Sequence, residues 1–258
     1  MTDKTALITG ASSGIGLELS KLFARDGYSL VLVARSTHKL ESLAAELKRE
    51  FGVAVIILTA DLSQSGAAKH IFEAVHARGI HIQSLVNNAG FGIHKPLAET
   101  DPDENIQMLQ VNIAALTELT RLFLPGMLEQ KDGRILNVGS TGSFGPSPYM
   151  AAYCASKAYV LSFSEGLAEE LRGTGVTVTA LCPGVTPTGF QERAQVGNMP
   201  LVRYGVVSAE KVAAAGYNAM RRGKLRVVPG FANQLLVLVM SLTPRTILLR
   251  FAGRMMTE

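Results

Sequence analysis

Short apolar runs alternate with helical patterns along the chain. The runs lie around Leu7, Val31, Val55, Leu85, Ile135, Val178 and Val227. Between them, apolar residues recur every three or four positions, as on one face of an amphipathic helix. Strands that alternate with helices in this way form a largely parallel sheet covered on both faces. We therefore predict an α/β fold with a doubly wound sheet of seven mostly parallel strands.

Composition is that of one globular unit. The 258 residues are 47% hydrophobic and 18% charged, and no repeat or low-complexity tract divides them. A chain of this length can bury about three-quarters of its extended surface. We expect a single domain over residues 1–258. Because the net charge of +4 is mild and the basic residues are spread out, we expect no nucleic-acid partner.

Cysteine and histidine usage bears on location and metal binding. Cys154 and Cys182 are the two cysteines, and the first strand begins near Thr5, which leaves no signal peptide. We therefore expect a cytoplasmic protein with free thiols. Cys154 is interpreted as a small packed residue, with a redox role as the alternative. The five histidines are scattered without ligand spacing, so we predict no metal site.

A glycine-rich turn follows the first apolar run and leads into a helix. Its spacing is Gly-x-x-x-Gly-x-Gly. Glycines allow a tight turn and the close approach of a pyrophosphate, which binds the amide donors and the positive end of the following helix. The turn predicts a dinucleotide site, and an ordinary glycine-rich strand–helix turn is the alternative. The candidate contacts are Gly10, Ser12, Ser13, Gly14, Ile15 and Gly16.

The residue after the second apolar run bears on the choice of cofactor. Arg35 follows the run 28–34, and no Asp or Glu lies between Asp26 and Glu41. At this place an acidic residue binds the ribose 2′-hydroxyl of NAD, whereas an arginine accommodates the 2′-phosphate of NADP. We therefore predict NADP(H) as the cofactor. A solvated charge at the end of a strand is the alternative interpretation of Arg35.

Tyr153 and Lys157 are the candidate proton-transfer residues. Residues four apart share one helix face, about 5–6 Å apart at Cβ. A phenol has a pKa of about 10, and a neighbouring cation lowers it. We expect Lys157 to lower the pKa of Tyr153, which then exchanges a proton with a carbonyl or hydroxyl substrate. Ser140 follows an apolar strand over 134–138, at the edge where open parallel sheets bind ligands.

Together with further motifs, these residues resemble the short-chain dehydrogenase/reductase family from Thr5 to about Pro229. Each motif is modest alone, and jointly they are very specific. The resemblance is greatest to bacterial single-domain members that prefer NADP. It implies a Rossmann-type fold and a homodimer or homotetramer. The matching motifs are Thr9-Gly10-(three residues)-Gly14-Ile15-Gly16, Asp61-Leu62, Asn87-Asn88-Ala89-Gly90, Asn112, Ser140, Tyr153, Lys157 and Pro183-Gly184.

The resemblance also implies a role for each matching residue. Tyr153 is the general acid in reduction and the base in oxidation, Lys157 holds the nicotinamide ribose, and Ser140 hydrogen-bonds the substrate oxygen. Asn112 keeps a helix locally open around a water that passes protons onward. From the sequence alone, Asp61 also fits a helix cap and Asn112 an exposed amide. Further implied cofactor contacts are Thr9, Asp61, Leu62, Asn88, Ala89, Gly90, Pro183, Gly184, Val185 and Thr188.

The substrate side is predicted from less regular segments. Residues 185–207 have poor periodicity, and a loop of this length is typical of a lid over substrate. Phe91, Phe144 and Phe190 lie on loops that we expect at the same sheet edge. They predict an apolar pocket for a hydrophobic ketone, aldehyde or secondary alcohol. The alternative is that these side chains only pack the lid against the domain.

The segment 231–258 is unusually apolar. Neither of its apolar stretches reaches the roughly twenty residues that a membrane-spanning helix needs. Three interpretations stay open: a helix packed on its own domain, a subunit interface, or a peripheral membrane contact. The last is supported by Arg245, Arg250 and Arg254.

The predicted function is an NADP-dependent carbonyl reductase or alcohol dehydrogenase acting on a small molecule. The alternative is an NADP-binding regulatory protein that senses redox state without turnover. The set of Ser140, Tyr153 and Lys157 argues against a sensor, because a sensor has no use for a poised phenol. A sugar-nucleotide epimerase or dehydratase would need an added substrate domain, for which we expect no room.

Overall fold

The computed structural model describes residues 4–188 and 205–256, with side chains described as far as residue 250. Its centre is a seven-stranded sheet in the order β3-β2-β1-β4-β5-β6-β7, and every neighbouring pair is parallel. All seven predicted runs form strands, which confirms the Rossmann-type α/β fold. The strands are β1 (Thr5–Thr9), β2 (Ser29–Ala34), β3 (Val55–Thr59), β4 (Ser84–Asn87), β5 (Gly133–Val138), β6 (Val176–Leu181) and β7 (Arg226–Val227).

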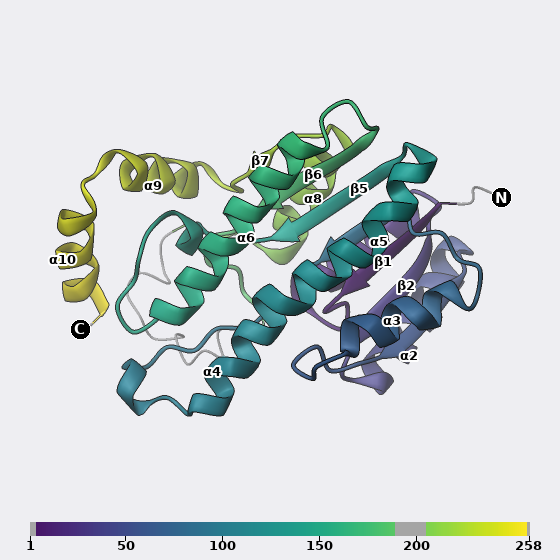
Figure 1. Ribbon diagram of the computed structural model, residues 1–258, viewed down its shortest axis with the longest axis horizontal. Helices are drawn as coiled ribbons and strands as arrows, with labels where there is room; N and C mark the ends of the chain where they lie inside the picture. The colour runs from purple at the N-terminus through teal and green to yellow at the C-terminus, as the bar shows by residue number, and fades with distance from the viewer. Residues whose placement is uncertain (1–3, 189–204, 257–258) are drawn as a thin grey trace.

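Helices cover both faces of the sheet (Figure 1). One face carries α1 (Gly14–Arg25), α2 (Thr37–Phe51) and α8 (Ala209–Arg221). The other carries α3 (Ala67–His76), α4 (Pro102–Leu109), α5 (Leu116–Gln130) and α6 (Ala151–Glu170). The shorter helical segments are η1 (Leu97–Glu99), η2 (Gln110–Ala115) and η3 (Thr141–Phe144).

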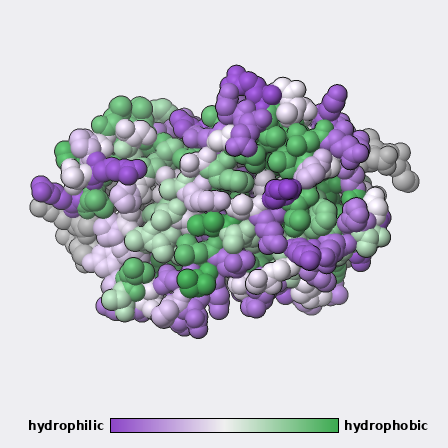
Figure 2. Space-filling model, in the orientation of Figure 1, coloured by the Kyte–Doolittle hydropathy of each residue, from purple (hydrophilic) through white to green (hydrophobic). Residues whose placement is uncertain are grey.

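Two helices follow the last strand and lie apart from the sheet: α9 (Phe231–Leu242) and α10 (Arg245–Met256) (Figure 1). On one side of α9, Val237 is buried and Met240 packs closely against Gly145. A Cβ added to Gly145 would lie 2.6 Å from the Met240 Cε. Its other side is exposed, and Figure 2 shows hydrophobic side chains at the surface over α9. Packing on its own domain therefore accounts for one side of this helix only.

No helix in the described ranges combines the length and hydropathy that crossing a bilayer requires.

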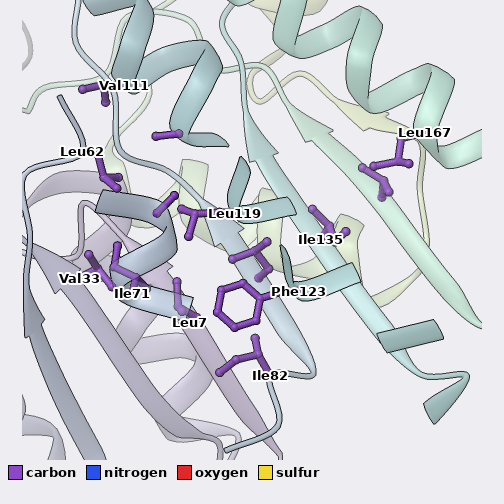
Figure 3. Packing of buried hydrophobic residues seen from close by; sticks show 14 of the residues in the cluster. Leu7, Val33, Leu62, Ile71, Ile82, Val111, Leu119, Phe123, Ile135 and Leu167 are labelled. Carbon is purple, nitrogen blue, oxygen red and sulfur yellow. The ribbon is translucent and has the colours of Figure 1, made fainter. Parts of the chain in front are cut away.

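The core consists of two hydrophobic layers, one on each side of the sheet. In the layer under α3 and α5, Leu7 of β1 and Ile135 of β5 pack with Ile71 and Phe123 (Figure 3). In the other layer, Phe23 of α1 packs edge-on against the ring of Tyr217 from α8 at a centroid distance of 4.8 Å. Because both faces of the central strands are buried, their sequences are nearly continuous apolar runs. This packing holds the carboxyl ends of the strands in place.

Candidate active site

A cavity of about 710 Å³ lies at the carboxyl ends of the strands. Its walls come from the loops after β1 to β6 and from α6, α9 and α10. Thr9 and Gly16 do not line it but support the turn behind it. The predicted cofactor contacts that line the cavity are Gly10, Ser12, Ser13, Gly14, Ile15, Arg35, Asp61, Leu62, Asn88, Ala89, Gly90, Tyr153, Lys157, Pro183, Gly184, Val185 and Thr188.

The glycine-rich turn is tied to the end of β4. The Thr9 hydroxyl accepts hydrogen bonds from the backbone N–H groups of Asn88 and Ala89, both at 3.0 Å. The Asn88 side-chain amide donates to the carbonyl oxygens of Thr9 at 2.9 Å and Gly10 at 3.2 Å. A Cβ on Gly16 would collide with the Gly10 carbonyl oxygen and lie 2.5 Å from Nδ2 of Asn88. The turn therefore excludes a side chain at this position.

The same turn leaves room for a ligand phosphate. Gly10 has a φ of 66°, in the left-handed region that favours glycine. Helix α1 begins at Gly14, and in the described residues Ser13 makes no side-chain capping hydrogen bond to it. The first amide groups of a helix need partners and carry the positive end of its dipole. A backbone cradle with this chemistry fits the pyrophosphate of a dinucleotide.

Arg35 lies at the end of the cavity formed by the start of α2. Ser36 and Lys39 line the same end. The first turn of α2 holds no acidic residue, so two cations and a helix N-terminus meet there. Asp61, which also lines the cavity, accepts hydrogen bonds at Oδ1 from the Ser63 N–H at 3.0 Å and the Ser63 hydroxyl at 2.8 Å. These bonds close a turn at residues 61–63, whereas helix α3 begins at Ala67 with Gly66 as its N-cap, so the helix-cap interpretation of Asp61 is wrong.

The three predicted catalytic side chains meet at the middle of the cavity. Tyr153 and Lys157 project from the first turns of α6, and Ser140 comes from the end of β5 as the N-cap of η3. The Tyr153 side chain is hydrogen-bonded to Ser140. The Lys157 Nζ donates to the Val138 carbonyl oxygen at 2.9 Å and lies 5.9 Å from the centroid of the Tyr153 ring. Burial of both residues keeps this arrangement away from bulk water.

Burial dominates the ionisation of the pair. It raises the pKa of Tyr153 to about 12, against the opposing effect of the hydrogen bond with Ser140. It also lowers the pKa of Lys157 to about 8. The expectation that Lys157 lowers the pKa of Tyr153 is therefore wrong. The Lys157 ammonium donates to the Val138 carbonyl, and desolvation penalises the phenolate form of Tyr153. At neutral pH the phenol keeps its proton.

Asn112 lies in η2, a π-helical segment between α4 and α5. Its buried amide nitrogen donates to the Phe91 carbonyl oxygen and the Ser156 hydroxyl, both at 3.0 Å, and its oxygen accepts from the Phe91 N–H at 3.2 Å. A Cβ on Gly90 would lie 2.9 Å from the Asn112 Oδ1 and 3.2 Å from the Lys157 Nζ. The helix is locally widened as the family resemblance implies, and the exposed-amide alternative is wrong.

Two of the aromatic side chains predicted to contact substrate lie in the described part of the chain, and they differ in position. Phe91 lines the cavity, but Phe144 does not. The Phe144 ring packs near Leu161 and Cys182, with the Arg226 guanidinium carbon 5.8 Å from its centroid. The short helix η3 turns this side chain away from the cavity, so the substrate contact predicted for it is wrong.

Phe190 and most of the proposed lid at 185–207 fall within residues 189–204, outside the described part of the chain.

Several cavity residues were not predicted from sequence. Leu236 and Met240 of α9 and Leu248 of α10 add apolar side chains to the lining of the cavity. An apolar helix looks the same in sequence whichever side it buries, so periodicity did not reveal them. Lys39 did carry a signal, because a cation in the first turn of a helix opposes the helix dipole.

The two cysteines behave as small packed residues. Burial raises the pKa of the Cys154 thiol to about 11 and of the Cys182 thiol to about 12, so neither is a thiolate at neutral pH. This favours the packing interpretation of Cys154 over a redox role. Within residues 4–188 and 205–256, no three His, Cys, Asp or Glu side chains cluster in a way that could hold a metal ion.

Comparison with known proteins finds similar sequences among curated proteins. A very-long-chain 3-oxoacyl-CoA reductase of Anas platyrhynchos is 37% identical over 184 residues, which cover 69% of this chain and 58% of that protein. The chain spans about three-fifths of the length of such curated relatives.

Solved structures match over nearly the whole chain. A short-chain dehydrogenase from Sphingobium yanoikuyae in complex with NADPH is 35% identical, with a TM-score of 0.83 and 91% of each chain covered. A short chain dehydrogenase/reductase from Burkholderia phymatum in complex with NAD is 28% identical, with a TM-score of 0.81 and 92% of each chain covered. The family model described as short chain dehydrogenase matches residues 4–198. The chain thus belongs to the short-chain dehydrogenase/reductase family of oxidoreductases.

Proposed function

We propose that this protein is an NADP-dependent oxidoreductase that interconverts a hydrophobic carbonyl compound and its alcohol. The observation that carries the proposal is the meeting of Ser140, Tyr153 and Lys157 in one cavity with a glycine-rich dinucleotide cradle. A regulatory protein that only senses the cofactor would not need a buried phenol hydrogen-bonded to a serine at that place. Catalysis is therefore favoured over sensing.

The proton chemistry follows from the three side chains. A bound nicotinamide cofactor supplies or accepts the hydride. In the direction of reduction, the Tyr153 hydroxyl donates its proton to the substrate oxygen while the Ser140 hydroxyl hydrogen-bonds the same oxygen. With a pKa of about 12, Tyr153 is in the protonated form that this direction requires at neutral pH. In oxidation the roles reverse, and Tyr153 accepts the proton from the alcohol.

Lys157 and Asn112 serve the proton supply. The Asn112 side-chain oxygen and the Lys157 Nζ both lie next to Gly90. The π-helical turn widens the helix at Asn112. We propose that Lys157 binds the cofactor ribose. We also propose that a water at Asn112 reprotonates Tyr153 after it has donated its proton to the substrate. Replacement of either residue would then slow turnover while the hydrogen bond between Tyr153 and Ser140 remains.

NADP is proposed over NAD on the chemistry of one end of the cavity. Arg35 and Lys39 provide two cations beside the N-terminus of α2, and no acidic residue lies in that turn. A 2′-phosphate is neutralised there, whereas a bare 2′-hydroxyl lacks the carboxylate that usually binds it. Of the two solved relatives, the one from Sphingobium yanoikuyae, at 35% identity, contains NADPH, and the one from Burkholderia phymatum, at 28% identity, contains NAD.

The proposed substrate is a bulky or long-chain apolar ketone. Phe91, Met150, Leu236 and Met240 present apolar surface to the same cavity as the catalytic serine and tyrosine. Burying such surface contributes about 25 cal/mol per Å², so long apolar substrates gain the most. The similarity to very-long-chain 3-oxoacyl-CoA reductases points to the same class of substrate.

The test replaces the proton donor without changing its ring. In Tyr153→Phe we expect kcat with NADPH and a panel of steroid, acyl-chain and small carbonyl compounds to fall about 10²- to 10⁴-fold. NADPH binding, measured by fluorescence titration, should stay within a few-fold of the parent. Tyr159→Phe is the matched control, because Tyr159 lies on the same helix, outside the cavity lining, and bonds Thr117 at 3.0 Å.

Two outcomes would count against the proposal. Tight NADPH binding by the parent protein without turnover of any carbonyl or alcohol in the panel would favour the sensor. Equal rates for Tyr153→Phe and the parent would remove Tyr153 from the chemistry.

A further inference from the structure

The outer side of α9 carries a stripe of large apolar side chains in solvent. Phe231, Leu235, Leu238 and Leu242 follow one another at intervals of four, three and four residues, which places them on one face of the helix. They are 81%, 52%, 55% and 77% exposed. We call these four residues the outer stripe. An exposed apolar stripe of this kind on a helix marks a surface that contacts a partner.

The opposite side of α9 packs on the domain and lines the cavity. Asn233 and Val237 are buried, and Leu236 and Met240 line the active-site cavity. Helix α9 contains no charged residue at all. A surface helix usually has one apolar face and one charged face, so the outer stripe is not explained by packing on this protein's own domain.

Positive charge accompanies the outer stripe. Arg245 and Arg250 of α10 are exposed, and neither makes an ion pair with another residue in the described part of the chain. Arg254 follows on the same helix, and the sequence holds no Asp or Glu from Lys211 to Thr257. The sequence segment that contains the stripe and α10 therefore carries charge of one sign.

We propose that α9 and α10 dock on the surface of an anionic lipid bilayer. The outer stripe would enter the boundary between headgroups and acyl chains, and the arginines would contact lipid phosphates. Helices that lie in the membrane surface have this composition: large apolar residues on one side, basic residues nearby and too little length to span. The proposal concerns location and holds whether or not the proposed redox activity is correct.

A second copy of the chain fits this surface less well. A two-fold contact through the outer stripe would bring the same patch of each copy together. Arg245 and Arg250 would then face a surface that carries arginines and no carboxylate from its own helices. Anionic lipid supplies the missing negative charge.

The test measures vesicle binding of the full chain by flotation. We expect co-flotation with vesicles that contain phosphatidylglycerol and much less with pure phosphatidylcholine. Leu235→Glu/Leu238→Glu should lower the bound fraction at least tenfold, and Arg245→Gln/Arg250→Gln should lower it about tenfold for anionic vesicles. The matched control is Leu97→Glu/Ile106→Glu, which alters apolar residues on η1 and α4 that are at least as exposed.

A fluorescence probe covers the case in which the charged variants do not fold. The chain has no tryptophan, so Leu235→Trp introduces a single reporter on the outer stripe. Its emission should shift to the blue with phosphatidylglycerol vesicles and be quenched by brominated acyl chains, whereas Leu97→Trp should not respond.

Absence of both the shift and co-flotation would overturn the proposal. So would unchanged flotation of Leu235→Glu/Leu238→Glu, or dissociation of an oligomer by that variant while the parent ignores vesicles.

Discussion

The two ends of the cavity are built in different ways. At the cofactor end, the glycine-rich turn is held by hydrogen bonds among Thr9, Asn88 and the backbone, and added atoms collide with it. At the end that we propose for the substrate, the lining includes apolar side chains from α9 and α10, which also expose apolar surface. Backbone geometry specifies the first end, whereas side-chain size shapes the second. Substrate range can therefore change without loss of the cofactor site.

This contrast extends to stability. Helix α9 has few buried residues, whereas every residue of β1 is buried. Segments with few buried contacts open at a lower free energy than core strands. We therefore expect amide hydrogen exchange in α9 to be faster than in β1.

The largest effect is expected at the cofactor end, from Arg35→Asp. The new carboxylate repels the 2′-phosphate of NADPH and accepts a hydrogen bond from the ribose of NADH. We expect the ratio of kcat/KM for NADPH to that for NADH to fall about 100-fold, with the KM of the carbonyl substrate within a few-fold of the parent. An unchanged preference would refute the role of Arg35. Arg49→Asp, an exposed site at the other end of α2, makes the same charge change as a control.

A smaller effect is expected at the substrate end, from Met240→Ala. Loss of this side chain removes part of the apolar wall, which we estimate costs binding on the order of 1–2 kcal/mol. The KM of a long-chain ketone should rise about tenfold, and NADPH affinity should stay the same. Val239→Ala removes an exposed neighbour that does not line the cavity, and serves as the control. If Met240→Ala also weakened the binding of NADPH, the cofactor end and the substrate end of the cavity would not be independent.

The smallest effect is expected from replacing Lys157, which lines the cavity between its cofactor and substrate ends. It is measured as a change in thermal stability. The pKa of Lys157 in the folded protein is about 8, below the ordinary 10.5, so the folded state disfavours the ammonium. The free energy of unfolding should rise between pH 8 and 10.5, where the unfolded chain keeps a proton that the folded chain has lost.

In Lys157→Met that pH dependence should be reduced. The melting temperature at pH 7 should rise by about 2–4 °C, the shift produced by about 1 kcal/mol in a protein of this size. Calorimetry across this pH range makes the comparison. A lower melting temperature would mean that the bond to the Val138 carbonyl outweighs the burial of charge.

Sequence reasoning succeeded where a local pattern determines the structure. Apolar runs predicted all seven strands, because strands buried on both faces of a parallel sheet are mostly apolar in sequence. The glycine-rich turn and the Tyr153–Lys157 pair were placed correctly, because both depend on residues close together in sequence. Ser140 joined them because strand ends share one edge of a parallel sheet.

The sequence-based predictions failed where the position of a side chain depends on the tertiary structure. Phe144 follows Ser140 closely, yet the turn of η3 sends its ring to the other side. The pKa of Tyr153 depends on burial, which no spacing reveals. Met240 and Leu248 line the cavity because of how α9 and α10 are placed in the tertiary structure, and that placement has no local sequence signal.

The π-helical turn around Asn112 has a consequence for chain length. Such a turn behaves as one residue inserted into an α-helix, and each residue rotates what precedes it by about 100°. Deleting one residue between 110 and 115 would restore regular winding but carry Met108 out of the core and detach the amide from Phe91. Natural relatives should therefore vary freely in many surface loops, while the residue count across this helix stays constant.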